Sequence, residues 1–205
     1  MPSSSSLALL ATVAASSPLL GLSAPEADAV PSLPGFDGPL PSKHYSGYLP
    51  TGKATGVAGQ LHYWLIEAEN SPETAPVALW LNGGPGSSSL VGLLTENGQV
   101  ATNVNSLNSS DPESTEVPKL FYNPYSWSQV AHVVYLEQPK GVGFSYCEDP
   151  DEACTNTDES TAADACESGR ERGGSIRTAS CPLDLHCSLT RRWCAAGRRG
   201  AGELL

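Results

Sequence analysis

The sequence predicts an α/β domain, because strand-like and helix-like segments alternate around one glycine-rich turn. Residues 76–82, "PVALWLN", are almost continuously apolar, as in a strand buried on both faces. The turn "NGGPGSSS" (82–89) follows, and after it leucines recur at helical spacing. Residues 129–139, "QVAHVVYLEQP", show a second buried-strand pattern, which Pro139 ends. Strand, glycine turn, helix, loop and strand in this order favour a sheet covered on both sides.

The segments before the first buried strand predict an extended lead-in and another strand. Residues 31–50 are rich in Pro and Gly, so we expect them to run as an extended lead-in. Residues 59–70, "GQLHYWLIEAEN", alternate and contain aromatic and β-branched residues, which is typical of a strand. The intervening "SPETAP" then predicts a turn into the strand at 76–82.

A helix is predicted directly after the glycine turn. Ser87 or Ser88 can serve as its N-cap, and its leucines lie within residues 90–94. An Asn-Gly pair ending at residue 98 marks its expected end. Residues 101–118 are polar and contain Ser, Asn, Asp and Pro, so we expect a long loop.

A further helix is predicted from Asp158 or Ser160, but its apolar pattern stops within two turns. Residues 1–165 contain four Lys, no Arg and 18 acidic residues, a net charge of −14. Residues 166–205 contain seven Arg, no Lys and four acidic residues, a net charge of +3, and show no sustained periodicity. We therefore expect 166–205 to be an unmatched Arg- and Cys-rich tail, either disordered or produced by a change of reading frame or exon near residue 165. A genuine basic tail is the alternative.

The overall composition bounds the class of protein. At 205 residues with 40% apolar residues, the chain suits one domain with a sizeable core. Its net charge of −11 argues against nucleic acid and anionic membrane surfaces as partners. No segment is apolar enough over a sufficient length to predict a membrane span, and no motif predicts a cofactor.

The N-terminus predicts a secretory signal peptide over residues 1–29. A modest apolar stretch runs from Leu7 to Leu22, and Ala27-Asp28-Ala29 fits a small-x-small cleavage pattern. The amino-terminal region lacks Lys and Arg, so a disordered or weakly hydrophobic N-terminus is the alternative. The domain itself is then expected over residues 30–165.

Cysteine usage fits export only in part, and one sequon would be used on an exported chain. Cys147 and Cys154 flank a short acidic loop and could form a disulfide in an oxidising compartment. Asn108 begins the sequon Asn-Ser-Ser, which would be glycosylated on a secreted chain. The remaining cysteines contain no CxxC pair, so a zinc site is not expected; they are Cys166, Cys181, Cys187 and Cys194.

The glycine turn could bind an anion or could merely connect two elements. A Walker phosphate loop needs Lys followed by Ser or Thr, and no Lys lies between Lys53 and Lys119. The dinucleotide pattern G-x-G-x-x-G also fails, because Ser89 stands where the third Gly should be. Backbone N–H groups and the positive end of the following helix still favour an anion. The turn alone does not choose between this interpretation and a simple connection.

A longer set of motifs resembles the serine carboxypeptidases, of the lysosomal cathepsin A and carboxypeptidase Y type. The residues that carry it are "PVALWLNGGPGSSSLVGLLTENG" together with "YSGYL", "LHYWLIEAE", "NPYSW" and "VVYLEQPKGVGFSY". They span about residues 42–165 in the expected order. The resemblance implies the N-terminal part of an α/β-hydrolase fold, left incomplete here. In that family a Ser-His-Asp triad removes the C-terminal residue of a peptide.

The resemblance also implies roles for four residues near the glycine turn. Asn82 and Gly83 would bind the terminal carboxylate of the substrate, and the N–H of Gly84 would form part of the oxyanion hole. Neutral amide and backbone donors can do this without adding a competing titrating group. Glu96 corresponds to an acid that the family pairs with a second Glu, so that a shared proton lets the site accept a carboxylate at acidic pH. By itself Glu96 reads as a surface acid.

The chain departs from the family pattern at two points. Ser87 stands where the family usually has a Cys, so the corresponding disulfide cannot form. The nucleophile elbow G-x-S-x-G is absent from the 205 residues. Its nearest match contains Ser145 within "GVGFSY", a separate family motif, so Ser145 is not expected to be the nucleophile. Three histidines are expected to be packed or exposed and not catalytic: His44, His62 and His132. His186 lies in the unmatched tail, in no recognisable motif.

These observations predict a serine-type carboxypeptidase lineage and an inactive 205-residue chain. Losing the nucleophile costs on the order of 10⁶ in turnover, which one oxyanion donor cannot compensate. A non-enzymatic fragment or decoy that binds peptide C-termini is the alternative function. An unrelated secreted binding domain is a third possibility. The expected compartment is the secretory pathway, the lysosome or vacuole, or the extracellular space.

Overall fold

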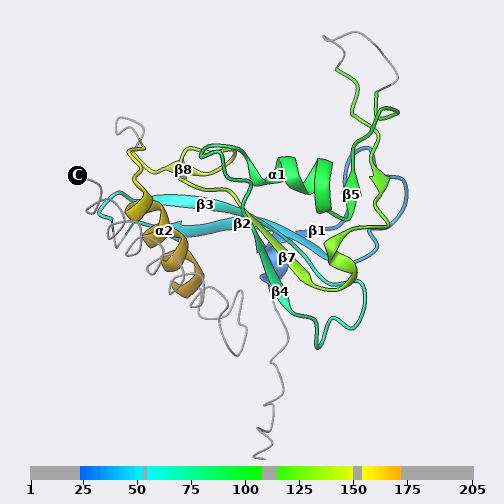
Figure 1. The fold of residues 1–205 in the computed structure, drawn as a ribbon, viewed down its shortest axis with the longest axis horizontal. Coiled ribbons are helices and arrows are strands. Elements are labelled where there is room, and N and C mark those ends of the chain that lie inside the picture. Colours follow the sequence, from blue (N-terminus) through cyan, green and yellow to red (C-terminus); the bar gives the residue numbers. More distant parts are fainter. Residues whose placement is uncertain (1–23, 53–54, 108–114, 150–153, 172–205) are drawn as a thin grey trace, which may run out of the picture.

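The computed structural model describes residues 24–171, apart from 53–54, 108–114 and 150–153. Most of the predicted signal peptide, the sequon at Asn108 and the tail from residue 172, including His186, lie outside the described residues. The described part is built on one mixed sheet with helices on both of its faces (Figure 1). This arrangement confirms the predicted α/β class.

The main sheet has the strand order β1-β2-β3-β7-β4. All neighbours in it are antiparallel except β4 and β7, which run parallel. β8 pairs with the beginning of β3, and β5 and β6 form a separate two-stranded sheet. The strands are β1 (Ala29–Val30), β2 (His44–Thr51), β3 (Gly59–Ile66), β4 (Val77–Trp80), β5 (Val100–Ala101), β6 (Phe121–Tyr122), β7 (His132–Leu136) and β8 (Tyr146–Cys147).

β2 and β3 form the longest pairing of the molecule. Their register runs from His44 opposite Ile66 to Thr51 opposite Gly59. The prediction that all of residues 31–50 form a lead-in is therefore wrong from His44 onward, because these residues make a full sheet strand. The predicted strands at 59–70, 76–82 and 129–139 are confirmed as β3, β4 and β7, each shorter than expected.

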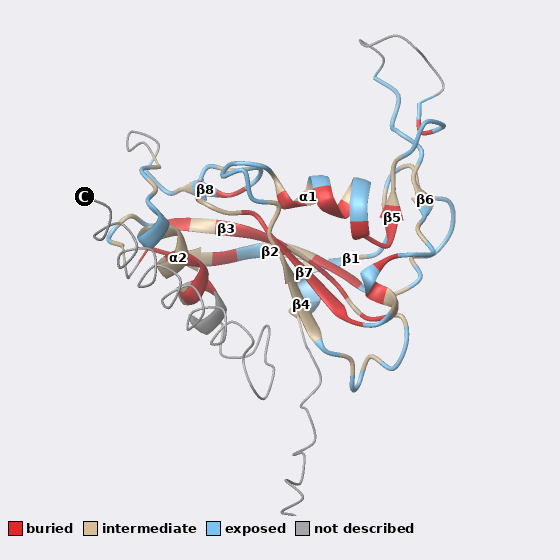
Figure 2. Cartoon of the chain, viewed as in Figure 1, coloured by how far each residue is buried: buried red, intermediate tan, exposed pale blue. Residues whose placement is uncertain are grey.

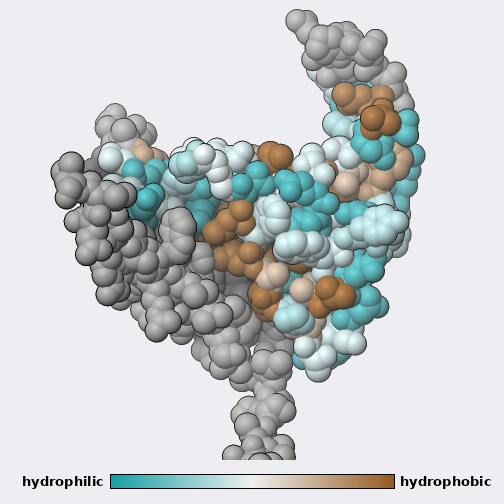
Figure 3. Space-filling view, viewed as in Figure 1, coloured by the Kyte–Doolittle hydropathy of each residue, from teal (hydrophilic) through white to brown (hydrophobic). Residues whose placement is uncertain are grey.

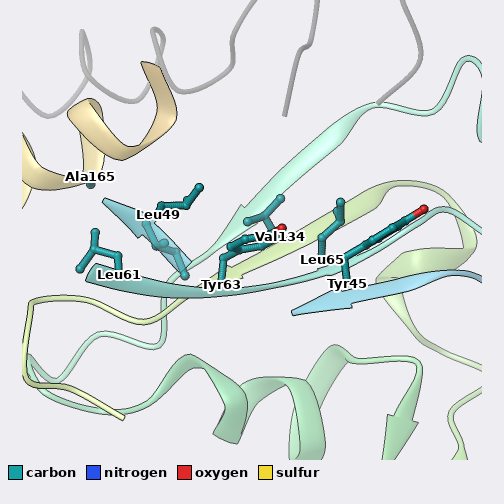
Figure 4. Packing of buried hydrophobic residues seen from close by; sticks show 8 residues of the cluster. Tyr45, Leu49, Leu61, Tyr63, Leu65, Val134 and Ala165 are labelled. Atoms are coloured by element: carbon teal, nitrogen blue, oxygen red, sulfur yellow. The ribbon is translucent and has the colours of Figure 1, made fainter. Parts of the chain in front are cut away.

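Alternation along β3 builds a core on each face of the sheet. Leu61, Tyr63 and Leu65 are fully buried and point to the face on which α2 lies (Figure 4). Trp64 and Ile66 point to the opposite face, where they pack with residues of the α1 region. Figure 2 shows buried residues running along the central strands between these two layers. Two-residue periodicity thus places a helix against each side of β3.

The helix after the glycine turn begins as predicted. α1 (Ser89–Gly92) continues into a short π-helical turn, η2 (Leu93–Asn97). The side chain of Ser88 accepts a hydrogen bond from the N–H of Leu90, which satisfies one donor at the helix start. The remaining short helical turns are η1 (Glu26–Asp28) and η3 (Trp127–Gln129).

The second helix, α2 (Asp158–Glu171), extends beyond the expected loss of its packing face. Ala165 is fully buried against the sheet, and Ser168 is also buried. Asp164 forms a buried ion pair with Lys140 at 3.0 Å and accepts a hydrogen bond from Thr51 at 2.8 Å. The apolar pattern does stop, but α2 continues to pack against the sheet beyond it. Polar and small residues make the contact, so an apolar period could not reveal it.

The outer side of β4 is an edge of the sheet within the described residues. β4 pairs only with β7 in the strand order, and all four of its residues are half-buried. Figure 3 shows hydrophobic side chains gathered over the region where β4 and β7 lie in Figure 1. An apolar edge of this kind favours pairing with another strand.

Candidate functional site

The candidate site is the turn that joins β4 to α1. Gly83, Gly84 and Gly86 all have positive φ angles, of 78°, 116° and 109°. These values lie in a region that glycine adopts without the steric cost of a side chain. The N–H of Ser87 donates to the carbonyl of Gly83 at 3.1 Å and closes the turn. Residues 83–87 are exposed, so the backbone donors that are not used within the turn face solvent.

Asn82 is held in one orientation at the start of this turn. Trp80 Nε1–H donates to Asn82 Oδ1 at 3.2 Å, which directs the amide NH₂ group away from the indole. The backbone N–H of Asn82 donates to Ser89 Oγ at 3.3 Å, and Ser89 Oγ donates to the carbonyl of Leu136 at 2.7 Å. Trp80 therefore orients the side-chain amide of Asn82, while Ser89 ties the Asn82 backbone to α1 and, through Leu136, to β7.

A close approach of α1 to β4 completes this support. A Cβ added to Gly92 would lie 2.3 Å from Trp80 Nε1 and 2.7 Å from Asn82 Oδ1. Only glycine therefore allows α1 to pack directly on the Trp80–Asn82 hydrogen bond. The arrangement offers a neutral amide beside exposed backbone N–H groups at a helix start, which can bind a carboxylate or an oxyanion.

Glu96 lies on η2 and its side chain is exposed. Its backbone carbonyl accepts from Asn123 Nδ2 at 3.4 Å. No hydrogen bond or ion pair connects the Glu96 carboxylate with the turn among the described residues. The structure thus brings Asn82, Gly83 and Gly84 together, and it leaves the role of Glu96 in substrate binding as a prediction.

Glu137 holds the glycine turn in place through a hydrogen bond from Ser88. It was not among the residues predicted for the site. Ser88 Oγ–H donates to Glu137 Oε1, His62 Nδ1 lies 3.0 Å from Oε2, and the N–H of Phe144 donates to Oε2 at 2.9 Å. Glu137 is fully buried. Burial alone would raise its pKa, but the hydrogen bonds from His62, Ser88 and Phe144 outweigh it and lower the pKa. A charged residue inside the apolar segment 129–139 was the available signal.

Two of the three histidines in the described part of the chain, His44 and His132, are packing residues, as expected. His44 Nδ1 accepts from Trp64 Nε1, so its Nε2–H donates to Gln99 Oε1 at 2.7 Å. His132 Nδ1 accepts from the N–H of Ala68, and its Nε2 lies 2.9 Å from the carbonyl of Pro72. Both rings are buried and serve as neutral bridges within the fold. His62 differs, because its partners are a carboxylate and a serine hydroxyl.

Ser145 is also a structural residue in this fold. It is buried, and its hydroxyl donates to the carbonyl of Glu137 at 2.6 Å while accepting from the N–H of His62 at 2.8 Å. These bonds hold the segment after β7 against β3.

Cys147 and Cys154 form a disulfide that closes the following loop. Within the described ranges, no group of three or more His, Cys, Asp or Glu side chains could hold a metal ion, and no helix could span a membrane.

Comparison with known proteins decides the family. The family model described as serine carboxypeptidase matches residues 34–168, about two thirds of the chain. The chain belongs to the serine carboxypeptidase family. It is 46% identical over 143 residues to serine carboxypeptidase-like 20 of Arabidopsis thaliana, which covers 70% of this chain and 27% of that relative.

Two further relatives give the same picture. Serine carboxypeptidase 1 of Hordeum vulgare is 46% identical over 123 residues, covering 60% of this chain and 23% of the relative. The lysosomal protective protein of Mus musculus is 44% identical over 126 residues, covering 62% and 23%. A solved structure of a prohormone-processing carboxypeptidase from Saccharomyces cerevisiae overlaps 68% of this chain and 29% of its own, with a TM-score of 0.47 and 25% identity.

The chain spans about a quarter of the length of these relatives. The family assignment and the mixed sheet agree with the predicted N-terminal portion of an α/β-hydrolase fold. The matched region contains the whole glycine turn and its supports, from Ser46 on β2 to Phe144 after β7.

Proposed function

We propose that this chain carries the carboxylate-binding half of a serine carboxypeptidase site and, by itself, does not cleave peptides. Asn82 and Gly83 would bind the C-terminal carboxylate of a peptide, and the N–H of Gly84 would act as an oxyanion donor. The main support for this proposal is the way Asn82 is held beside the exposed turn. Trp80 orients its side-chain amide, and Ser89 accepts from its backbone N–H. A preorganised amide of this kind binds an anion at little cost in reorganisation.

We expect no peptide hydrolysis because the sequence lacks a serine in the position of the family's nucleophile. The 205 residues contain no G-x-S-x-G elbow, and Ser145 is committed to two backbone bonds. We expect no cleavage of a blocked dipeptide by the purified chain. Cleavage that a serine-directed reagent inhibits would overturn this part of the proposal.

Binding is tested separately from cleavage. We expect the chain to bind an N-acylated dipeptide with a free carboxylate and to bind its C-terminal amide much more weakly, because the amide removes the charge that the turn holds. Asn82→Ala should weaken binding of the acid form, while Asn70→Ala, at an exposed site whose side chain donates to the carbonyl of Gln129, serves as the control. Equal affinity for acid and amide would contradict the assignment of Asn82 and Gly83.

Two origins of such a chain remain to be distinguished by the transcript. A frame that restores elbow-like sequence after codon 165 would support an exopeptidase as the gene product. A confirmed stop after Leu205 would support a non-enzymatic product that binds peptide C-termini. In either case the disulfide between Cys147 and Cys154 and the family of the relatives favour the secretory pathway, with the lysosome, the vacuole or the extracellular space as the final compartment.

A further inference from the structure

Three side chains on neighbouring strands form a hydrogen-bonded chain beside the glycine turn. Ser46 lies on β2, His62 on β3, and Glu137 directly after β7. Ser46 Oγ is 2.9 Å from His62 Nε2, and His62 Nδ1 is 3.0 Å from Glu137 Oε2. Serine, imidazole and carboxylate in this order have the geometry of a hydrolytic triad, which is recognised by its geometry and not by its positions in the sequence.

The hydrogen bonds define where the protons lie. Glu137 accepts bonds from the Ser88 hydroxyl and the Phe144 N–H in addition to His62, so it is held as a carboxylate. A carboxylate can only accept, and His62 must therefore donate from Nδ1. The lone pair of His62 Nε2 is then directed at Ser46, whose hydroxyl donates to it. This is the tautomer that lets an imidazole act as a general base.

The serine opens onto a pocket that can admit a reagent. Ser46 and His62 line a pocket of about 510 Å³, and Ser46 itself is half-buried. The imidazole contacts the rings of Tyr48 and Phe144, each with a centroid distance of 5.4 Å. Trp64 also lines the pocket, and Phe144 is 62% exposed. Aromatic walls beside the hydroxyl suit an aryl or short apolar acyl group.

We propose that Ser46 is an activated nucleophile toward activated aryl esters and fluorophosphonates, with His62 as its general base and Glu137 as the residue that orients the imidazole. Ser46 Oγ forms a bond to the acyl carbon while its proton passes to His62 Nε2. The bond from that carbon to the aryloxide breaks, and the leaving oxygen takes the proton from His62. Water then hydrolyses the acyl-serine by the reverse route. With a fluorophosphonate, fluoride leaves and the phosphonyl group stays on Ser46.

The substrate class follows from the chemistry of the leaving group. Each oxyanion donor is worth about 10²–10³ in turnover, and an amide with its poor leaving group depends on such donors most. An aryloxide or fluoride departs readily, so the proton transfer to His62 can suffice for one acylation. The inference therefore covers esters and phosphonates and is separate from peptide binding at the glycine turn.

The test uses the protein secreted by a eukaryotic host from the full 205-codon sequence and treated with a biotinylated fluorophosphonate. Peptide mapping should place the adduct on Ser46, and p-nitrophenyl butyrate should release a burst of about one nitrophenolate per chain, as for acyl-enzyme formation. Ser46→Ala should abolish both signals, whereas Ser42→Ala, which removes a half-buried hydroxyl without a histidine partner, should leave them unchanged. His62→Phe should slow labelling about 10²-fold or more.

A thiol probe keeps the inference falsifiable if His62→Phe does not fold. In the S46C variant, an imidazole at this distance should favour the thiolate, so alkylation by iodoacetamide at pH 7 should be about tenfold faster than in S42C. Mapping by mass spectrometry separates these sites from the native cysteines. Equal alkylation rates in S46C and S42C, or fluorophosphonate adducts on other serines of a folded chain, would overturn the assignment. Neither result bears on peptide binding through Asn82.

Discussion

Gly92 shows how one residue sets the geometry of the candidate site. Gly92→Ala would bring a methyl group within 2.7 Å of both Trp80 Nε1 and Asn82 Oδ1. Because Gly92 is buried and the Trp80 ring packs edge-on against Trp127, we expect a loss of about 1–3 kcal/mol in the free energy of unfolding. Binding of a free peptide carboxylate should weaken as well. Urea denaturation and titration calorimetry measure the two effects.

Val91→Ala is the matched control for this substitution. Val91 precedes Gly92 on α1 and is 48% exposed, so shortening it should change stability by less than about 0.5 kcal/mol. If Gly92→Ala were as stable as the control and bound the acid peptide as tightly, the close approach of α1 would not be what positions Asn82.

His44 predicts a pH dependence of stability. Burial lowers its pKa below the ordinary value of 6.5. The hydrogen bond to Gln99 and the negative charge of Glu69 raise the pKa, but by less than burial lowers it. Below pH 6.5 the unfolded chain therefore binds a proton at His44 more readily than the folded chain does. The contribution of His44 to the free energy of unfolding is fully present above pH 6.5 and declines as the pH falls below it. One such group contributes at most about 1.4 kcal/mol per pH unit.

The measurement is the melting temperature between pH 7.5 and pH 5, for the native chain and for His44→Gln. Glutamine can keep both hydrogen bonds to Trp64 and Gln99 but does not titrate. We expect a shallower decline for the variant, although other acidic groups continue to titrate in both proteins. Parallel curves for the two proteins would show that His44 is not the source.

Residue-level contacts also mark the limit of what the sequence could predict. The glycine turn was recognisable because its residues are contiguous. The network around Glu137 joins positions that lie far apart, with His62 75 residues from Glu137 and Ser88 49 residues from it. No local pattern relates these positions, so His62 was expected to be a packing residue and Glu137 passed unnoticed.

At the scale of elements, α2 is held to the sheet by a buried ion pair. Lys140 and Asp164 are both almost fully buried, and their charged atoms lie 3.0 Å apart. Removing one partner leaves an uncompensated buried charge, so Lys140→Met should cost about 3–5 kcal/mol in the free energy of unfolding. The double variant Lys140→Met, Asp164→Leu should recover most of this loss.

Denaturant unfolding of the two single variants and the double variant completes the cycle. Losses that simply add in the double variant would mean that the two side chains act independently. The helix would then depend on its other contacts, such as Ala165 in the core.

The edge strand β4 should be the weak element of the sheet. β3 lies between β2 and β7, whereas β4 has β7 as its sole neighbour among the strands that the structure describes. We expect amides of residues 76–82 to exchange with solvent much faster than those of Leu61–Leu65, because opening an edge strand breaks one set of ladder bonds. Hydrogen exchange read by mass spectrometry tests this, with β3 as the internal control. Protection along 76–82 equal to that of β3 would count against an open edge.

The elements that the sequence predicted well are those with strong periodicity. β3, β4 and β7 have apolar or alternating patterns, and α1 has a serine cap before its leucines. β2 was missed because "HYSGYLPT" contains Gly and Pro and reads as a loop. The contact face of α2 was missed because Asp164, Ala165 and Ser168 are buried by packing and by polar partners that lie elsewhere in the chain.

The whole molecule combines an apolar sheet edge, which favours self-association, with a large negative charge, which opposes it. At pH 7 the net charge of −11 keeps copies apart at low ionic strength. Salt shortens the screening length from about 10 Å at 0.1 M to about 3 Å at 1 M, and the charge vanishes near the isoelectric point of about 4.6. Self-association through β4 should therefore increase with salt and as the pH approaches that value.

Light scattering after size exclusion, at 0.05 and 0.5 M NaCl, measures this last prediction. The informative variant is Ala78→Lys, because Ala78 is half-buried on β4 and belongs to neither core cluster. A lysine on an edge strand opposes pairing with another strand, so the variant should remain monomeric in 0.5 M NaCl while the native chain associates. Asn70→Lys adds the same charge at an exposed site outside β4 and controls for net charge. If both variants associate as the native chain does, the interface lies elsewhere, and the apolar edge of β4 is not what limits the solubility of this chain.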